Sequence, residues 1–411
     1  MKPLPEAQRE VLARMGRTEP VRVPLDEALG LVLAEDVRAG HDIPPFPNSA
    51  MDGFAVIGAE VVSAPVELDV VEDVAAGHVA VHRVEPGSAI RIMTGAPIPP
   101  GADTVVRVED TVIPDPGRVR VTVPTAIGTS VRPAGGDVAS GSVVFSAGTQ
   151  LTPPHIGMLA AIGAVAPLVY RRPRVSILST GDELVPPETE QLEPGHIRDT
   201  NRPLLRSLLS ELGVEYVDRG IVGDDAPLLR STLLDAAAQS DAILTSGGVS
   251  MGDYDLVKQV LTELGDIDLW RVAMQPAKPF AFGSIGSAPV FGLPGNPVSV
   301  LVAFEQFARP ALSVMMGRSA VFRKRSPGVM RERVETDPEK TVFLRVSVND
   351  GEPPEVRLAG EQSSNVLSAA AAADAFAVIP VGTGTVEPGE AVTLEWFRHP
   401  SARTVEEVLG S

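Results

Sequence analysis

Residues 174–317 alternate short apolar strands with helices, and this alternation restricts the possible folds more than any other feature of the chain. Strands are predicted at residues 175–178, 214–217, 241–244 and 290–292, and helices at residues 204–212, 226–239, 257–264 and 298–312. Strands that alternate with helices pair into a mostly parallel sheet through right-handed crossovers. We therefore predict an α/β domain in this part of the chain.

The ends of two of these helices carry residues that commonly cap helices. Asn201 is expected to cap the helix at residues 204–212, and Gly213 is expected to end it. Asn296 is expected to cap the helix at residues 298–312, with Pro297 in its first turn.

The segments on either side of this domain show a different pattern of expected secondary structure. Residues 11–15 and 29–37 show helical spacing, and Gly16 is expected to end the first of these helices. The proline-rich residues 41–47 then indicate a boundary. Residues 50–133 and the chain after residue 323 read as short strands with glycine and proline turns, and residues 369–373 fit either a short helix or a packed turn.

Composition excludes several classes of function. The formal net charge is -18, which argues against binding to nucleic acid or to an anionic membrane. The chain has no cysteine, so disulfides and thiolate chemistry are excluded. The first residues lack the apolar core of a signal peptide, and the longest apolar run, at residues 158–170, is too short to span a bilayer. We expect a cytoplasmic protein.

Three loops follow predicted strands and precede helices, at residues 179–183, 246–252 and 293–297. The carboxyl ends of parallel strands form the ligand crevice of such sheets. Glycines allow backbone N–H groups to approach an anion, and helix N-termini favour negative charge. The loops together predict a phosphate or oxyanion pocket, whereas each loop alone is equally an ordinary left-handed turn. Neither a dinucleotide glycine fingerprint nor a P-loop is present.

Acidic residues stand beside these loops, namely Asp182, Glu183, Asp224, Asp225, Asp253 and Asp255. As a set they suggest Mg²⁺, which takes a few carboxylates together with phosphate oxygens and water. Taken singly, each acid is explained by helix capping or by solvation. Lys278, flanked by prolines, is a candidate point charge for an oxyanion or a surface lysine. The six histidines show no metal-ligand spacing.

Several motifs together resemble one known family. They occupy residues 44–53, 91–96, 179–184, 199–201, 246–252, 278–279 and 292–297. In order and spacing the chain resembles the MoeA family, the molybdopterin molybdenumtransferases, to which the E domain of gephyrin is similar.

The resemblance implies an elongated multidomain subunit that forms a homodimer. Its fold class would be α/β plus β, with a MogA-like parallel α/β domain at residues 174–320, a β-rich domain inserted near the N-terminus at residues 46–133, and a C-terminal β-barrel-like domain at residues 321–411. Residues 1–45 and 134–173 would form a helical, linker and dimerisation region.

The implied reaction converts adenylylated molybdopterin and molybdate, with Mg²⁺, into molybdenum cofactor and AMP. The resemblance implies catalytic roles for Asp52, Thr94, Glu183, Asp224, Asp255 and Lys278, and Mg²⁺ ligation by Glu183, Asp224 and Asp255. It implies substrate binding by Thr180, Gly181, Asp182, Asp199, Asn201, Ser246, Gly247, Gly248, Ser250, Pro294, Gly295, Asn296 and Pro297. Asp52 and Thr94 would lie on the β-domain side of a cleft that the partner subunit completes. Transient contacts with the adenylyltransferase and with recipient molybdoenzymes are also expected.

The chain departs from the family pattern at several positions. Gln275 and Ala277 stand in a segment that often reads Lys-Pro-Gly-Lys-Pro, so one expected cation is missing. Phe54 replaces a frequent tyrosine, and residues 369–373 lack an arginine found in some eukaryotic relatives. Two other functions stay open: molybdopterin adenylylation, which consumes ATP, and a scaffold role like that of gephyrin.

Overall fold

The computed structural model describes residues 1–248, 256–349 and 351–398, and the chain divides into two compact units. The first unit comprises Met1–Val21, Gly30–Val32 and Val169–Ser411, and the second comprises Arg22–Leu29 and Leu33–Leu168. The expected division into four domains is finer than these two units and stays a prediction.

A six-stranded sheet organises the α/β part of the first unit. Its strand order is β16 (Glu215–Val222), β13 (Arg174–Thr180), β17 (Ala242–Ser246), β21 (Ala288–Leu293), β20 (Pro279–Ile285) and β18 (Asp266–Arg271). The first four strands pair in parallel, and β20 and β18 continue the sheet antiparallel. The predicted α/β domain is confirmed, and the two antiparallel strands were not predicted.

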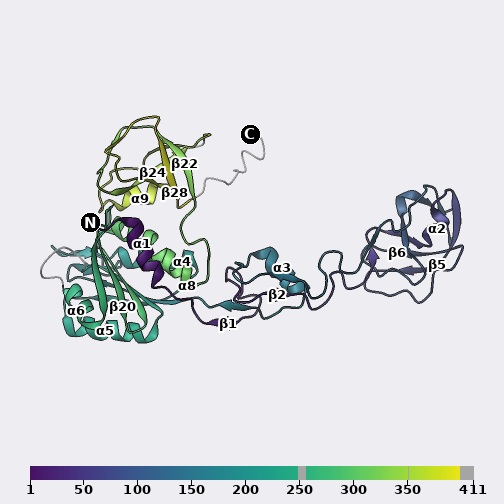
Figure 1. The fold of residues 1–411 in the computed structure, drawn as a ribbon, viewed down its shortest axis with the longest axis horizontal. Coiled ribbons are helices and arrows are strands. Elements are labelled where there is room, and N and C mark those ends of the chain that lie inside the picture. The colour runs from purple at the N-terminus through teal and green to yellow at the C-terminus, as the bar shows by residue number, and fades with distance from the viewer. Residues whose placement is uncertain (249–255, 350, 399–411) are drawn as a thin grey trace. The chain divides into compact units, whose positions relative to one another are not determined.

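Helices cover both faces of this sheet (Figure 1). One face carries α1 (Leu4–Ala13), α4 (Asn201–Leu212), α7 (Pro297–Ala303) and α8 (Arg309–Met315), and the other carries α5 (Ala226–Gln239) and α6 (Leu256–Leu264). The predicted bounds of α5 are confirmed, and Gly213 ends α4 with a φ of 75° as expected. Helix α1 ends before Gly16.

A π-helical turn, Phe304–Ala308, joins α7 to α8 into one apolar helix. Among the described residues, this is the single helix long and apolar enough to cross a membrane, but 94% of its most apolar stretch is buried inside the fold. Such burial is the pattern of a core helix, which passes the same test of length and composition.

The C-terminal part of the first unit is a closed, barrel-like sheet. Its order is β19 (Met274–Gln275), β24 (Thr341–Asn349), β25 (Glu355–Leu358), β22 (Arg325–Met330), β28 (Ala391–Trp396) and β26 (Ala375–Ile379), and β26 pairs with β24 to close it. Strands β23 (Val334–Glu335) and β27 (Thr385–Val386) form a smaller pair, and α9 (Leu367–Ala372) shows that the alanine run begins as a helix. The expected β-barrel-like domain is confirmed.

The second unit contains a six-stranded sheet between two apolar clusters. The sheet runs β7 (Thr104–Arg107), β4 (Gly53–Val56), β6 (Ser88–Ile92), β5 (Val66–Val74), β9 (Arg118–Val121) and β8 (Thr111–Val112). The second unit also contains α2 (Gly58–Val61), α3 (Pro153–Ala161), and the short pairs of β2 (Val37–Arg38) with β11 (Val143–Phe145) and β3 (Asn48–Ser49) with β10 (Val131–Arg132). A further short pair joins β1 (Pro20–Arg22) to β12 (Leu168–Tyr170).

The predicted helix at residues 29–37 is wrong. This segment forms turns and the start of β2 instead. The backbone N–H of Leu33 donates to the carbonyl of Thr149, and that of Ala34 donates to the carbonyl of Leu168. These long-range bonds replace the local bonds of a helix, because the apolar side chains here are buried consecutively and not on one helical face.

Candidate functional site

The three glycine loops lie side by side at one edge of the α/β sheet. Strands β13, β17 and β21 are neighbours, and their register places Ser179 beside Ser246 and Ser246 beside Leu293. The N–H of Gly247 donates to the carbonyl of Leu293 over 3.2 Å, which ties the second loop to the third. The predicted convergence of these loops at the strand ends is therefore confirmed for their described residues, which in the second loop are Ser246, Gly247 and Gly248.

The loops line a cavity of about 960 Å³. The expected site residues that line it are Thr180, Gly181, Glu183, Asp224, Gly247, Gly248, Lys278, Pro294, Gly295 and Asn296. The C-terminal barrel completes the wall with Lys340, Gln362, Ser363 and Ser364, which the sequence did not point to. Asp182, Asp199, Asn201, Ser246 and Pro297 lie outside this lining. Ser250 and Asp255 lie outside the described residues.

The first loop has a shape that only glycine allows. Gly181 has a φ of 136°, and a Cβ at this position would collide with the carboxylate of Glu183. The missing side chain therefore makes room for Glu183 to lie against the backbone of its own loop.

Asp182 positions the loop and does not line the cavity. Its Oδ1 accepts a hydrogen bond of 2.8 Å from the N–H of Asp224, which joins the first loop to the end of β16. The next residue, Asp225, caps α5 by accepting from the N–H of Leu228. In the two pairs that the structure describes, Asp182 and Asp225 thus bond to backbone N–H groups, while Glu183 and Asp224 line the cavity; Asp253 and Asp255 lie outside the described residues.

Asp199 is buried and serves as a capping residue for α4. Its Oδ1 accepts hydrogen bonds of 3.1 Å from the Ser179 hydroxyl and from the N–H groups of Asn201 and Arg202. The expectation that Asn201 caps this helix is wrong, because Asn201 is its first residue. Its amide instead donates to the carbonyl of Gly295 over 2.6 Å, which joins α4 to the third loop.

The third loop is also joined to the C-terminal barrel. Asn296 stands at the cap position of α7, but its side-chain amide donates to the Ser364 hydroxyl over 2.7 Å instead of capping the helix. The N–H of Val298 donates to the carbonyl of Ser364 over 3.1 Å. These bonds place residues 362–364 against the glycine loops.

Two acids of the cavity wall are of the type that binds metal ions. No group of three metal-binding side chains occurs within residues 1–248, 256–349 and 351–398. Glu183 and Asp224 supply two hard oxygen donors, and Mg²⁺ typically takes one or two carboxylates plus substrate phosphates and water. Glu183 and Asp224 are therefore the carboxylates of the described lining that could hold a divalent cation.

A second cavity of about 250 Å³ contains an arginine that the sequence reasoning missed. Arg345 on β24 lines it and is only 1% exposed. Its guanidinium donates to the carbonyls of Glu361 and Ser363, while its Nε has no hydrogen-bond partner in the described part of the chain. Burial lowers the pKa of Arg345 to about 10. The two cavities share Gln275, Pro276 and Gln362, so they adjoin.

In the second unit, Asp52 and Thr94 form a close pair. The pKa of Asp52 lies below its usual range, first because the Thr94 hydroxyl donates to it and second because the Thr94 N–H does so. The charge of Arg91 lowers this pKa further.

Three family models cover most of the chain. Residues 2–163 match the MoeA N-terminal region (domain I and II), residues 176–314 match a probable molybdopterin binding domain, and residues 327–397 match the MoeA C-terminal region (domain IV). A solved MoeA protein from Pyrococcus horikoshii matches with a TM-score of 0.83 and 30% identity, covering 97% of this chain and 100% of that one.

Named relatives agree with these models. The molybdopterin molybdenumtransferase of Haemophilus influenzae is 36% identical over 91% of this chain and 93% of its own length. Molybdopterin molybdenumtransferase 2 of Mycobacterium tuberculosis is 37% identical over 95% of this chain and 98% of its own length. Gephyrin from Dictyostelium discoideum is 31% identical over 95% of this chain and 62% of its own length. With its fold, its glycine-loop cavity and these likenesses, the chain belongs to the MoeA family of molybdopterin molybdenumtransferases.

Proposed function

We propose that the enzyme inserts molybdenum, converting adenylylated molybdopterin and molybdate to molybdenum cofactor with release of AMP. The observation that carries this proposal is the arrangement of the large cavity. Glycine loops and two carboxylates line it together with Lys278, and Arg345 lines the smaller cavity that adjoins it. The two adjoining cavities suit a substrate that carries a phosphoanhydride and a second substrate, an oxyanion, that binds beside it.

The backbone of the glycine loops would hold the phosphates. Gly247 and Gly248 have φ values of 92° and 67°, and both line the cavity. Such turns present N–H groups that bind anions without carrying a full charge, and because the N–H of Gly247 donates to the carbonyl of Leu293, Gly248 is the one of the two that would donate to a phosphate. Asn201, another proposed substrate-binding residue, supports the third loop through the carbonyl of Gly295.

Glu183 and Asp224, together with Asp255 outside the described residues, are the proposed magnesium ligands. Bound Mg²⁺ would neutralise charge on the phosphoanhydride as it is cleaved. The carboxylates would also orient the anhydride, so that catalysis comes mostly from positioning and charge neutralisation.

Lys278 and Arg345 are the proposed contacts of molybdate. Lys278 presents three donors on a flexible side chain, and Arg345 presents a planar group that is already desolvated. A buried cation without a carboxylate partner in the described residues is costly unless an anion compensates it. With no cysteine in the chain, the sulfurs that capture molybdenum belong to the substrate.

Asp52 and Thr94 are proposed as further catalytic residues, and a homodimer is the proposed assembly in which they act. We also propose a cytoplasmic location, with transient contacts to the adenylyltransferase that supplies the substrate and to the recipient molybdoenzymes. The net charge of -18 supports the absence of a nucleic-acid or anionic-membrane partner.

The experiment supplies purified protein with adenylylated molybdopterin, molybdate and Mg²⁺, and measures AMP and molybdenum cofactor. Molybdate-dependent AMP release is expected from the wild type and not from Asp224→Ala or Asp255→Ala. Asp235→Ala, an exposed aspartate of α5, is the matched control and retains activity. Consumption of ATP by unmodified molybdopterin would favour adenylylation instead, and unchanged AMP release in both site variants would refute the assignment of these two acids.

A further inference from the structure

The C-terminal barrel contributes a lysine to the large cavity. Lys340 lies in the turn that precedes β24 and lines the cavity together with Lys278. Within the described part of the cavity wall, these two lysines are the cationic residues. They come from segments more than 60 residues apart in the sequence.

The backbone explains why two such distant lysines meet. Strand β19 pairs in parallel with β24, with Met274 opposite Thr341. The N–H of Thr341 also donates to the carbonyl of Ala273 over 3.0 Å. Lys340 directly precedes this pairing and Lys278 lies three residues after the end of β19, so both lysines belong to one rim of the cavity.

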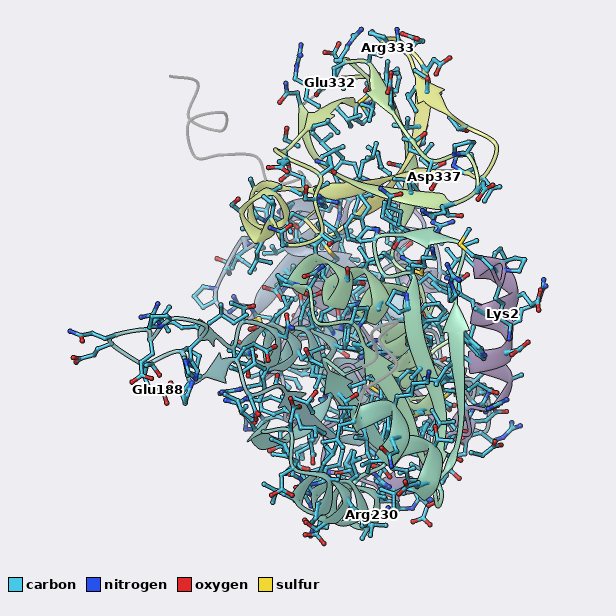
Figure 2. All side chains as sticks on the ribbon, turned by 90° about the vertical axis from the view of Figure 1, so that its left-hand side faces the viewer. Lys2, Glu188, Arg230, Glu332, Arg333 and Asp337 are labelled. Atoms are coloured by element: carbon cyan, nitrogen blue, oxygen red, sulfur yellow. The ribbon has the colours of Figure 1, made fainter. Side chains whose placement is uncertain are left out.

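Asp337 holds the side chain of Lys340 in place. Its Oδ2 lies 2.5 Å from the Nζ of Lys340, and its Oδ1 accepts a hydrogen bond from the N–H of Glu339. The side chain of Lys340 is 19% exposed and that of Asp337 is 32% exposed, so the ion pair is partly exposed. Figure 2 labels Asp337 in the C-terminal barrel, at its margin toward the α/β sheet.

The pKa of Asp337 also indicates that Lys278 is near. This pKa lies below the usual range, chiefly because Lys340 donates to the carboxylate and in smaller part because of the positive charge of Lys278. Asp337 and Arg345 both line the smaller, adjoining cavity. Lys278, Lys340 and Arg345 therefore line the two adjoining cavities near Asp337, while the other carboxylates of the lining are Glu183 and Asp224 in the large cavity and Glu335 in the small one.

We propose that Lys340, positioned by Asp337, binds the tetrahedral dianionic oxyanion substrate together with Lys278. The inference rests on the proposed function, under which that oxyanion is molybdate. Lys278 and Lys340 both line the large cavity, and their ammonium groups can donate charge-assisted hydrogen bonds to the oxygens of a dianion. The cation missing at Gln275 is then supplied from the barrel, through the pairing of β19 with β24.

A purely structural role for Lys340 has different consequences. A partly exposed ion pair contributes little to stability, and its loss would leave anion binding unchanged. The test therefore measures binding of molybdate alone to the purified protein by isothermal titration calorimetry. The variants are Lys340→Gln and Lys340→Met, which remove the charge, and Lys340→Arg, which retains it. Lys324→Gln, at an exposed lysine outside the cavity lining, is the control.

Removal of the charge is expected to weaken molybdate binding about tenfold, as loss of one charge-assisted hydrogen bond does. Lys340→Arg should stay near the wild type, and Lys324→Gln should equal it. In turnover, both neutral variants should raise the KM for molybdate and leave kcat and the KM for adenylylated molybdopterin unchanged. Unchanged affinity in both folded neutral variants would overturn the inference.

The same experiment separates this inference from the proposed function. If the wild type releases AMP while the neutral variants bind molybdate normally, the inference fails and the function stands. If the wild type releases no AMP but loses molybdate binding on Lys340→Gln, the oxyanion site stands and the proposed function fails. A wild type that binds no molybdate would overturn the inference by itself.

Discussion

The carboxylate of Asp52 accepts two hydrogen bonds from Thr94, one from the hydroxyl and one from the backbone N–H, each 2.7 Å long. Both donors stabilise the ionised carboxylate, which is why the pKa of Asp52 lies below its usual range. Asp52 is thereby held as an anion and as an acceptor, consistent with a positioning or electrostatic role and not with that of a general acid near neutral pH.

Replacement of Thr94 by valine should raise the pKa of Asp52 toward its ordinary value, because the hydroxyl donor is the largest cause of the depression. A carboxyl whose pKa is lowered on folding stabilises the native state above its unfolded pKa of about 4, and this contribution disappears as pH falls through the folded pKa. The pKa is measured by NMR titration of the Asp52 carboxyl carbon. Thr111→Val, which removes a hydroxyl that donates to a backbone carbonyl, is the control. An unchanged Asp52 pKa in Thr94→Val would contradict this account.

Gly181→Ala should disable the first loop. The added Cβ would meet the carboxylate of Glu183, and a φ of 136° is unfavourable for alanine. Displacement of Glu183 by about 1 Å is expected to reduce AMP release about a hundredfold. Gly16→Ala, which has open space around its Cβ, is the matched control and should retain activity. Equal activities of the two variants would show that the position of Glu183 does not matter.

Asn201→Ala should loosen the third loop. Its amide donates the 2.6 Å bond to the carbonyl of Gly295, and a lost hydrogen bond of this kind costs about 1 kcal/mol. We expect a lower thermal midpoint and a higher KM for adenylylated molybdopterin, since Gly295 lines the cavity. Asn365→Ala, at an exposed asparagine, should change neither quantity. A stability loss with an unaltered KM would limit Asn201 to a structural role.

Ala277→Gly should stabilise the protein. Ala277 has a φ of 72°, a left-handed conformation that costs a non-glycine residue about 1 to 2 kcal/mol. The loss of one buried methyl group offsets about 0.8 kcal/mol of that relief, so a net gain of up to about 1 kcal/mol is expected. Chemical denaturation of the two proteins measures the difference. Destabilisation by the glycine would mean that the methyl group packs more favourably than the backbone strain costs.

The sequence was most informative where local patterns coincide with the fold. Helix α5 has the predicted bounds because a proline in its first turn and an acidic cap mark its start. The three glycine loops were found because parallel strands end at a common edge. The segment at residues 29–37 was misread because its burial depends on distant bonds to Thr149 and Leu168 that periodicity does not encode.

Only part of the site was predicted, because some of its residues reach the cavities through contacts between distant segments of the chain. Residues on the glycine loops could be found, whereas Lys340 and Arg345 reach the cavities through the barrel and the pairing of β19 with β24. A charged residue inside the apolar strand around Arg345 was an available signal. The bonding of Asp182 and Asp199 to backbone could not be told from ligand binding, because both roles use the same carboxylate beside the same loops.

The most direct test of the account is a single-turnover measurement of AMP release from adenylylated molybdopterin, with and without molybdate, by the wild type and by Glu183→Ala. The account predicts about one equivalent of AMP per site from the wild type only when molybdate is present, with molybdenum cofactor formed in step, and little from the variant. Release that is independent of molybdate, or equal in the two proteins, would contradict it.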